Sequence, residues 1–233
     1  MVKKMFRWVL KFRNISLLKY IYLNYFCGNI VREKGCHIIP YRNSRIELRK
    51  NCKICLSGNN MEIGVNKIKG SKAETLVRLK DGAVWNCKNG CRLVYNSVLE
   101  VHENALLDTG FFYMNSYSVI VCTKHITIGE DVWMGRNIII YDSDYHQIRN
   151  SSGQMTNHSK PVVLGNHVWL TNQVMVMKGV HIGEGAVITP FSVIKKDIPA
   201  NCLAGNKYNV EVFKNDINWS SERVTDWGYI EGD

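Results

Sequence analysis

A polar stretch in the middle of the chain carries the side chains best suited to acid–base chemistry. Asp142, Asp144 and His146 alternate with other residues at the start of segment 141–161, which has no periodic apolar positions. An imidazole with an unperturbed pKa of about 6.5 can take the proton of an attacking hydroxyl at neutral pH. Either aspartate could orient the ring or stabilise its charged form. The competing interpretation is a surface-loop histidine beside turn-forming aspartates.

The segments that flank this stretch share an unusual period. Between residues 162 and 196 every sixth residue is aliphatic, and the residue two before each is small or apolar. The aliphatic positions are Leu164, Leu170, Val176, Ile182, Ile188 and Ile194, and the same phase holds upstream at Cys122, Ile128, Met134 and Ile140. A period of six is neither helical nor a plain alternation. It predicts short strands in triangular coils, stacked around a continuous aliphatic column.

The period also suggests how the chain is divided. From about Ser44 to Phe111 the pairing of apolar residues persists but its phase slips, which indicates irregular early coils of the same solenoid. The repeat stops within 141–161, and a loop this long inside a compact repeat is uncommon unless it is functional. We therefore expect a basic, helical segment at 1–43, a solenoid at 44–204 with an extruded loop at 141–161, and a C-terminal tail at 205–233 with no assigned role.

The positive charge is concentrated near the N-terminus. The net charge is +10, and residues 1–53 hold 13 Lys/Arg and 2 Asp/Glu, so the folded body is close to neutral. This distribution argues against a nucleic-acid binder, whose basic stripe would lie on the body. No apolar run in 1–26 reaches the roughly 20 residues that span a bilayer, and charges interrupt any signal peptide. Basic and aromatic residues in 1–26 fit a helix at an anionic lipid surface, or equally a helix packed on its own coil or a neighbouring subunit.

The eight cysteines are scattered along the chain. Cys52 and Cys55 with Cys87 and Cys91 could be combined into a zinc site, but the spacing is irregular and no histidine is conveniently placed. Buried small side chains explain them better, so no metal is expected. Free thiols on this scale indicate a reducing, cytoplasmic setting, with peripheral contact at the inner face of the membrane as an addition.

The six-residue register resembles the hexapeptide-repeat acyltransferases, whose fold is an all-β solenoid, a left-handed parallel β-helix. The resemblance is specific from about Phe112 to Asn206, and residues 188–199 look like the family's closing coil. It implies a homotrimer with sites between subunits, and a transfer of acetyl from acetyl-CoA. By this resemblance His146 at the root of the extruded loop is the general base, with Asp144 beside it.

The resemblance extends to the contacts with both substrates. Segment 112–120 is similar to the acceptor-side strand of the galactoside and maltose O-acetyltransferases, in which the asparagine matching Asn115 binds the sugar; Asp142 and Tyr145 are further acceptor candidates. The alternative for Asn115 is a turn residue of the coil. The positions that the resemblance implies for acetyl-CoA are Trp169, Thr171, Asn172, Thr189, Pro190 and Lys196. Two departures bear on that groove: Thr189-Pro190-Phe191 replaces a run of small residues, and residues 205–209 lack the family's closing proline.

The predicted function is acetyl-CoA-dependent O-acetylation of a sugar or polysaccharide-unit hydroxyl by direct transfer. The alternatives are N-acetylation of an amino sugar or nucleotide sugar, and an inactive trimeric scaffold, which the two departures favour. The γ-type carbonic anhydrases share the solenoid but need a His-x4-His pair that this sequence lacks.

Overall fold

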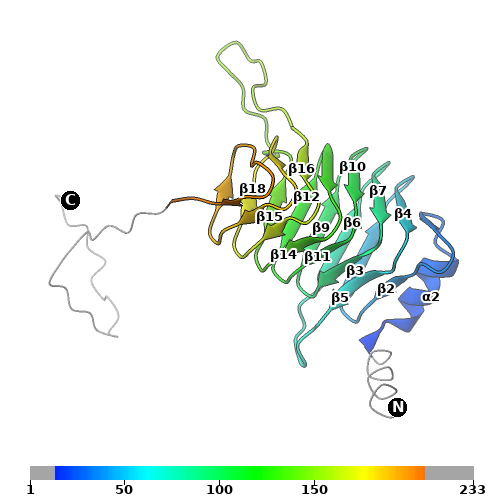
Figure 1. The fold of residues 1–233 in the computed structure, drawn as a ribbon. Helices are drawn as coiled ribbons and strands as arrows, with labels where there is room; N and C mark the ends of the chain where they lie inside the picture. The colour runs from blue at the N-terminus through cyan, green and yellow to red at the C-terminus, as the bar shows by residue number, and fades with distance from the viewer. Residues whose placement is uncertain (1–13, 208–233) are drawn as a thin grey trace, which may run out of the picture.

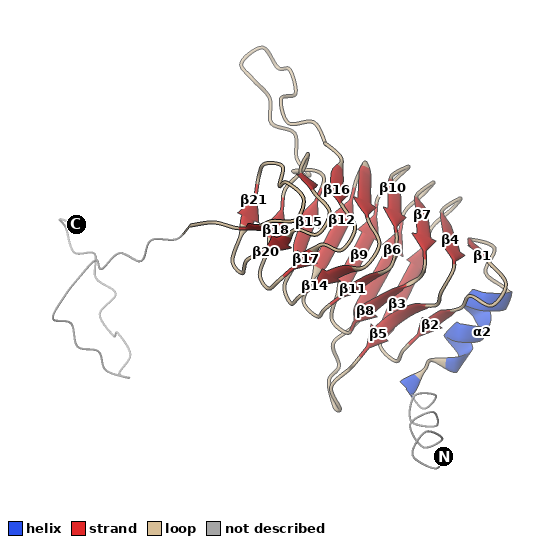
Figure 2. Cartoon of the chain, in the orientation of Figure 1, coloured by secondary structure: helices blue, strands red, loops and turns tan. Residues whose placement is uncertain are grey.

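The computed structural model describes residues 14–207, which form a three-sided parallel β-helix preceded by one helix (Figures 1 and 2). Successive strands enter three parallel sheets in rotation, so each strand pairs with the strand one coil earlier and the strand one coil later. The expected solenoid is confirmed. Residues 1–13, and the expected tail from residue 208 onward, lie outside the described residues.

The three sheets and the helix have the following bounds. The helix is α2 (Leu17–Tyr25). The first sheet contains β1 (Ile30–Arg32), β4 (Lys53–Ser57), β7 (Val84–Lys88), β10 (Leu106–Thr109), β13 (His125–Ile128), β16 (Val162–Leu164) and β19 (His181–Ile182). The second sheet contains β2 (Ile38–Pro40), β5 (Met61–Val65), β8 (Cys91–Val94), β11 (Phe112–Met114), β14 (Val132–Met134), β17 (Trp169–Leu170), β20 (Val187–Ile188) and β22 (Leu203–Ala204). The third sheet contains β3 (Ser44–Leu48), β6 (Thr75–Leu79), β9 (Val98–Val101), β12 (Val119–Cys122), β15 (Ile139–Tyr141), β18 (Met175–Val176) and β21 (Val193–Ile194).

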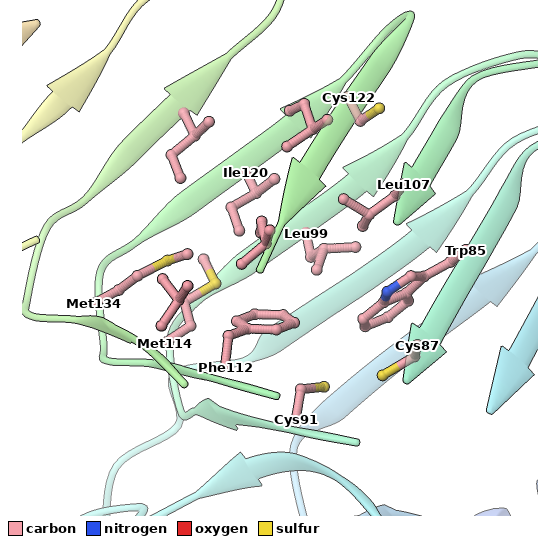
Figure 3. Packing of buried hydrophobic residues seen from close by; sticks show 14 of the residues in the cluster. Trp85, Cys87, Cys91, Leu99, Leu107, Phe112, Met114, Ile120, Cys122 and Met134 are labelled. Carbon is pink, nitrogen blue, oxygen red and sulfur yellow. The ribbon is translucent and has the colours of Figure 1, made fainter. Parts of the chain in front are cut away.

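The column inside the three sheets is the one that the period of six predicts. Each of the predicted aliphatic positions is buried, and these are Leu164, Leu170, Val176, Ile182, Ile188 and Ile194. In the wider early coils Trp85 and Phe112 fill the column, with ring centroids 6.5 Å apart (Figure 3). Six of the eight cysteines are buried and all are free thiols, as expected for small apolar side chains. Each coil therefore buries its share of one continuous core.

The corners between sheets are turned by residues with a left-handed backbone. Eight of these are asparagines with positive φ, at positions 43, 51, 66, 89, 96, 104, 137 and 201. Asparagine tolerates this conformation better than other residues with a Cβ atom. Each corner is named by the two sheets that it joins. The second–third corner follows each strand of the second sheet, and the third–first corner follows each strand of the third sheet.

The solenoid begins earlier than the expected boundary at residue 44. Strand β1 already pairs with β4, Ile30 opposite Ile54, and β2 pairs with β5. Helix α2 lies against β2 and caps the open end of the coils (Figure 1). The first strand has three residues, none of them fully buried, and is too short to show a period of six. Within the described residues, no helix is long and apolar enough to cross a membrane.

A corner glycine shows how closely the coils approach. A Cβ atom added to Gly135 would lie 1.5 Å from the carbonyl oxygen of Thr171 in the next coil. We expect Gly135→Ala to lower the free energy of unfolding by about 1–3 kcal/mol, because the backbone must shift. Urea denaturation measures this change. Gly28→Ala is the control, since nothing lies within 4 Å of that position; equal losses in both variants would contradict the prediction.

Candidate active site at two corners of the solenoid

The segment that interrupts the period is a loop extruded at the third–first corner. It leaves the solenoid after β15 and returns at β16 (Figure 1). Strand β16 pairs with β13, Ile126 opposite Val162, so the first sheet continues without a break. The loop therefore stands outside the coils, and its first residues are fixed by the corner from which it departs.

Asp142 is the anchor of this loop. Its side chain is fully buried. Its carboxylate accepts hydrogen bonds from the backbone N–H groups of Thr123, Lys124 and His125 and from the Thr123 hydroxyl, at 2.7–2.8 Å. The expectation that Asp142 contacts an acceptor is therefore wrong. A charge-assisted cluster of this kind fixes the loop root to the preceding coil.

Asp144 is held by the coil that follows the loop. Its carboxylate accepts hydrogen bonds from the ammonium group of Lys178 and from Asn157 Nδ2, the latter at 3.0 Å. The hydrogen bond from Lys178, followed by that from Asn157, lowers the pKa of the Asp144 carboxyl below its ordinary value. Among the described residues the carboxylate makes no hydrogen bond or ion pair with the imidazole of His146. The expected role of Asp144 as the orienter of that ring is replaced by an ion pair that ties the loop to the coil.

His146 is presented to solvent by this anchored root. Its backbone N–H donates to the carbonyl of Asp144 at 2.7 Å, and its own carbonyl accepts from Asn157 Nδ2 at 2.8 Å. The residue is exposed. Within residues 14–207 its imidazole has no hydrogen-bond partner. The backbone is therefore held on both sides while the ring stays available to a bound molecule.

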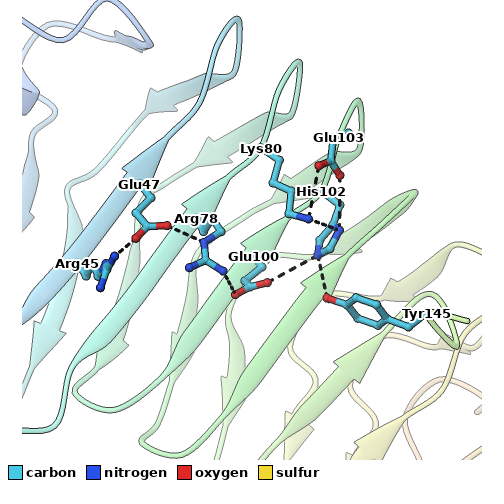
Figure 4. A network of polar contacts seen from close by, with 8 residues as sticks. All are labelled: Arg45, Glu47, Arg78, Lys80, Glu100, His102, Glu103 and Tyr145. Atoms are coloured by element: carbon cyan, nitrogen blue, oxygen red, sulfur yellow. Dashed lines mark hydrogen bonds and ion pairs between the residues drawn. The ribbon is translucent and has the colours of Figure 1, made fainter.

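Tyr145 closes the root against the third sheet. Its hydroxyl lies 2.8 Å from His102 Nε2, and the two rings meet edge to face at 5.3 Å (Figure 4). Lys80 Nζ lies 3.2 Å from His102 Nδ1. Because an ammonium group only donates, Nδ1 accepts and the Nε2–H donates to Tyr145. Burial, and then the charge of Lys80, lower the pKa of His102, which favours this neutral form. Within the chain, Tyr145 therefore joins the loop root to the coils. Its contact with an acceptor stays a prediction.

The other predicted residues gather at the second–third corner. Asn115 follows β11, Thr171 and Asn172 follow β17, and Thr189 and Pro190 follow β20. Several of their polar side-chain atoms form hydrogen bonds within the corner itself. Asn115 Oδ1 accepts from the N–H of Ser116, Asn172 Oδ1 accepts from the N–H of Arg136, and the Thr171 hydroxyl donates to the carbonyl of Ile188.

An aromatic row on the outside of the second sheet leads to this corner. Tyr113, Trp133 and Trp169 occupy equivalent places in successive strands. The rings of Tyr113 and Trp133 stack at 5.3 Å, and Trp169 is 52% exposed. Trp169 therefore offers an open apolar surface beside the corner, as a donor-binding residue would require.

The structure does not bring the two groups of predicted residues together within one chain. Asn115 and the donor candidates border one edge of the third sheet, whereas His146 borders the other edge. Lys196 lies on the His146 side, because Val176 pairs with Ile194 and Lys196 therefore sits one coil above Lys178. Within one chain the predicted residues therefore form two separate groups.

Four residues that the sequence analysis did not single out contribute to these corners: Asn157, Lys178, His102 and Arg136. Lys178 could have been predicted from the strand register, because it lies one full coil before Lys196, which the sequence analysis names. Arg136 is exposed at the second–third corner, and its guanidinium has no acidic partner in the described part of the chain. His102 and Asn157 have no sequence signal, because their contacts join segments that are far apart in the chain.

A thiol nucleophile is disfavoured at the loop root. Cys122 Sγ lies 3.8 Å from Asp142 Oδ2. Burial, and then the nearby carboxylate, raise the pKa of this thiol well above its ordinary value. Because the thiolate is the reactive form, the raised pKa disfavours Cys122 as a nucleophile.

The ion pair between Asp144 and Lys178 predicts a pH dependence of stability. Since the folded-state pKa of Asp144 is depressed, its stabilisation is present above the ordinary carboxyl pKa of about 3.9 and is lost as the pH falls through the lower folded value. We expect Lys178→Met to cost about 1 kcal/mol at neutral pH, and the difference from the wild type to shrink below about pH 3. Urea denaturation at both pH values tests this, with the exposed Lys124→Met as control. A difference that stays constant with pH would contradict it.

Comparisons with known proteins identify the repeat. Residues 161–196 match the bacterial transferase hexapeptide family (six repeats). The galactoside O-acetyltransferase of Escherichia coli K12 is 35% identical over 96 residues, which are 40% of this chain and 46% of that protein. The polysialic acid O-acetyltransferase of Neisseria meningitidis is 30% identical over 139 residues, 59% of this chain and 57% of that protein. The chain thus spans about half the length of these relatives.

A solved structure is also similar in part. The acetyltransferase VCA0836 of Vibrio cholerae, in complex with acetyl-CoA, has a TM-score of 0.38 and 22% identity, and the likeness covers 55% of this chain and 66% of that one. The repeat at residues 161–196 is thus that of the bacterial hexapeptide transferases, and the chain is similar over part of its length to curated O-acetyltransferases.

Proposed function

We propose that the protein transfers an acetyl group from acetyl-CoA to a hydroxyl of a saccharide acceptor, with His146 as general base. The observation that carries the proposal is the form of the loop root. Asp142 and Asp144 fix its backbone to two coils, and the imidazole between these coils is exposed and unpaired within the described residues. The relatives named as sugar and polysialic acid O-acetyltransferases support the class of acceptor.

The chemical step is a direct displacement. The acceptor oxygen attacks the thioester carbonyl carbon while the imidazole of His146 takes the hydroxyl proton. The C–S bond breaks, and the imidazolium returns the proton to the departing thiolate. A covalent enzyme intermediate is not needed, in keeping with the protonated state of Cys122.

The site is completed by a neighbouring copy of the chain. His146 and Asn115 lie at opposite edges of the third sheet, so a pocket that uses both needs the second–third corner of another subunit. A closed ring of three copies satisfies every corner in the same way. We therefore propose a homotrimer with three equivalent sites.

The donor would lie along the second–third corner. The indole of Trp169 and the ring of Pro190 offer apolar surface there, while Thr171 and Asn172 shape the backbone. Two cations suit the phosphates of coenzyme A: Arg136 at this corner and Lys196, which would come from the third–first corner of the neighbour. Arginine binds phosphate in a bidentate manner and lysine as a point charge.

Calorimetric titration with acetyl-CoA, followed by a thiol-release assay over a panel of saccharides, tests the function. We expect saturable donor binding and acceptor-dependent thiol release. An amino sugar as the only accepted class would assign N-acetylation instead. The absence of donor binding would overturn the proposal and leave a scaffold, with Thr189-Pro190-Phe191 closing the groove.

A further inference from the structure

Helix α2 is turned with its apolar side toward solvent. Its inward side chain Asn24 is buried and bonds both backbone groups of Ile38, with Nδ2 to the carbonyl at 2.8 Å and Oδ1 to the N–H at 2.9 Å. The opposite face exposes six large apolar or aromatic side chains: Leu17 (59%), Leu18 (83%), Ile21 (40%), Tyr22 (57%), Tyr25 (61%) and Phe26 (74%). A surface helix ordinarily buries its apolar stripe, whereas this stripe is left uncovered by the described part of the chain.

A basic cavity adjoins the helix. Asn14, just before α2, lines it together with Arg42, Lys67, Lys69 and Arg92, and its volume is about 960 Å³. Of these cations, Arg92 pairs with Glu62 at 2.5 Å. The other three cations have no carboxylate partner within residues 14–207. The cavity therefore suits an anion that supplies the missing negative charge.

The loop between β5 and β6, residues 66–74, combines both features. Ile68 is 62% exposed and lies between Lys67 and Lys69. In Figure 1 this loop and the start of α2 project from the same side of the solenoid, whereas the loop 141–161 projects from the opposite side. The apolar tip flanked by lysines and the exposed face of α2 adjoin the same cavity through Asn14, which lines it just before the helix.

We propose that this surface docks the protein on an anionic membrane. The apolar side chains of α2 and Ile68 enter the boundary between headgroups and acyl chains, where aromatic rings such as Tyr22 and Tyr25 are favoured. The cavity holds lipid headgroup phosphates through Arg42, Lys67 and Lys69. This inference is independent of the catalytic proposal.

The charge of the cavity favours a lipid surface over residues 1–13 of the same chain and over a second copy of the chain. Residues 1–13 contain five Lys/Arg and no acid, so they would bring like charge to the cavity. A second copy related by two-fold symmetry would place the same cations face to face. An anionic bilayer supplies negative charge and an apolar interior together, which neither alternative does.

Co-sedimentation of the full chain with vesicles tests the proposal. We expect binding to vesicles of phosphatidylcholine with phosphatidylserine, weak binding to phosphatidylcholine alone, and weakening of the anionic binding by salt. Lys67→Glu with Lys69→Glu should reduce it about tenfold or more. The matched control, Lys53→Glu with Lys88→Glu on the first sheet, changes the net charge equally and should retain binding.

A second pair of variants tests the apolar face. Leu18→Ser with Tyr22→Ser should also reduce vesicle binding at least tenfold, whereas Leu203→Ser, equally exposed but distant, should not. No binding to anionic vesicles, or equal losses in the two lysine pairs, would overturn the proposal. A changed mass in solution for Leu18→Ser with Tyr22→Ser, with unchanged vesicle binding, would overturn it too and assign the face to contact between copies.

Discussion

Replacement of His146 by alanine is expected to lower the rate of acetyl transfer by about 10²- to 10⁴-fold, the range that general bases contribute. Donor binding should stay close to that of the wild type, because the imidazole lies at the third–first corner and the main donor residues at the second–third corner. Thiol release measures the first quantity and calorimetric titration the second.

His158→Ala is the matched control for this experiment. His158 is also an exposed histidine of the loop 141–161, so its removal should leave the rate within about twofold if only His146 acts as a base. Equal rates in the wild type and in His146→Ala would refute the assignment of the base. A parallel loss of donor binding would instead show that the variant has damaged the groove.

Asp142→Asn is expected to lower the free energy of unfolding by about 3 kcal/mol or more. Hydrogen bonds to a charged group contribute about 1.5–3 kcal/mol each, and a buried donor left unpaired costs the desolvation of that group. The carboxylate now accepts from three backbone N–H groups and a hydroxyl. An amide of the same shape would turn an NH₂ group toward some of these donors.

Urea denaturation measures this change, and Asp81→Asn serves as the control. Asp81 is exposed, so its replacement should alter stability by less than about 0.5 kcal/mol. Thiol release should fall in Asp142→Asn as well, because the root that presents His146 loses its attachment to the preceding coil. An unchanged midpoint in Asp142→Asn would mean that the loop root is not an element of stability.

The coils could be predicted from the sequence because their signal is local and repeated. Val176 and Ile194 each follow the preceding aliphatic position by six residues, and both are buried as the period requires. The first coil escaped the pattern because Ile30–Arg32 is short and pairs on one side only, and because β2 of the same coil lies against α2. The burial of β2 depends in part on this helix, and a helix does not carry the period of six.

The site was predictable only in part, for a different physical reason. The interruption at 141–161 is visible as a loss of period, so the sequence could place His146 on a loop. The direction of each carboxylate was not visible. Asp142 turns inward to the backbone of residues 123–125 and Asp144 turns to Lys178, and both choices depend on which coil passes the loop root. Such contacts across coils have no signature within the loop.

The uninterrupted pairing of β13 with β16 has an evolutionary consequence. Because the first sheet closes behind the loop, the outer part of the loop, between His146 and Asn157, can lengthen, shorten or change in sequence without disturbing the core or the loop root. Under the proposed function, mutation of this outer part can alter the preferred acceptor while the residues of the solenoid stay under unchanged selection. A chimera that carries the corresponding loop of a relative would keep the same solenoid but prefer a different acceptor. In this way related proteins could acquire new substrates by changes in this loop alone.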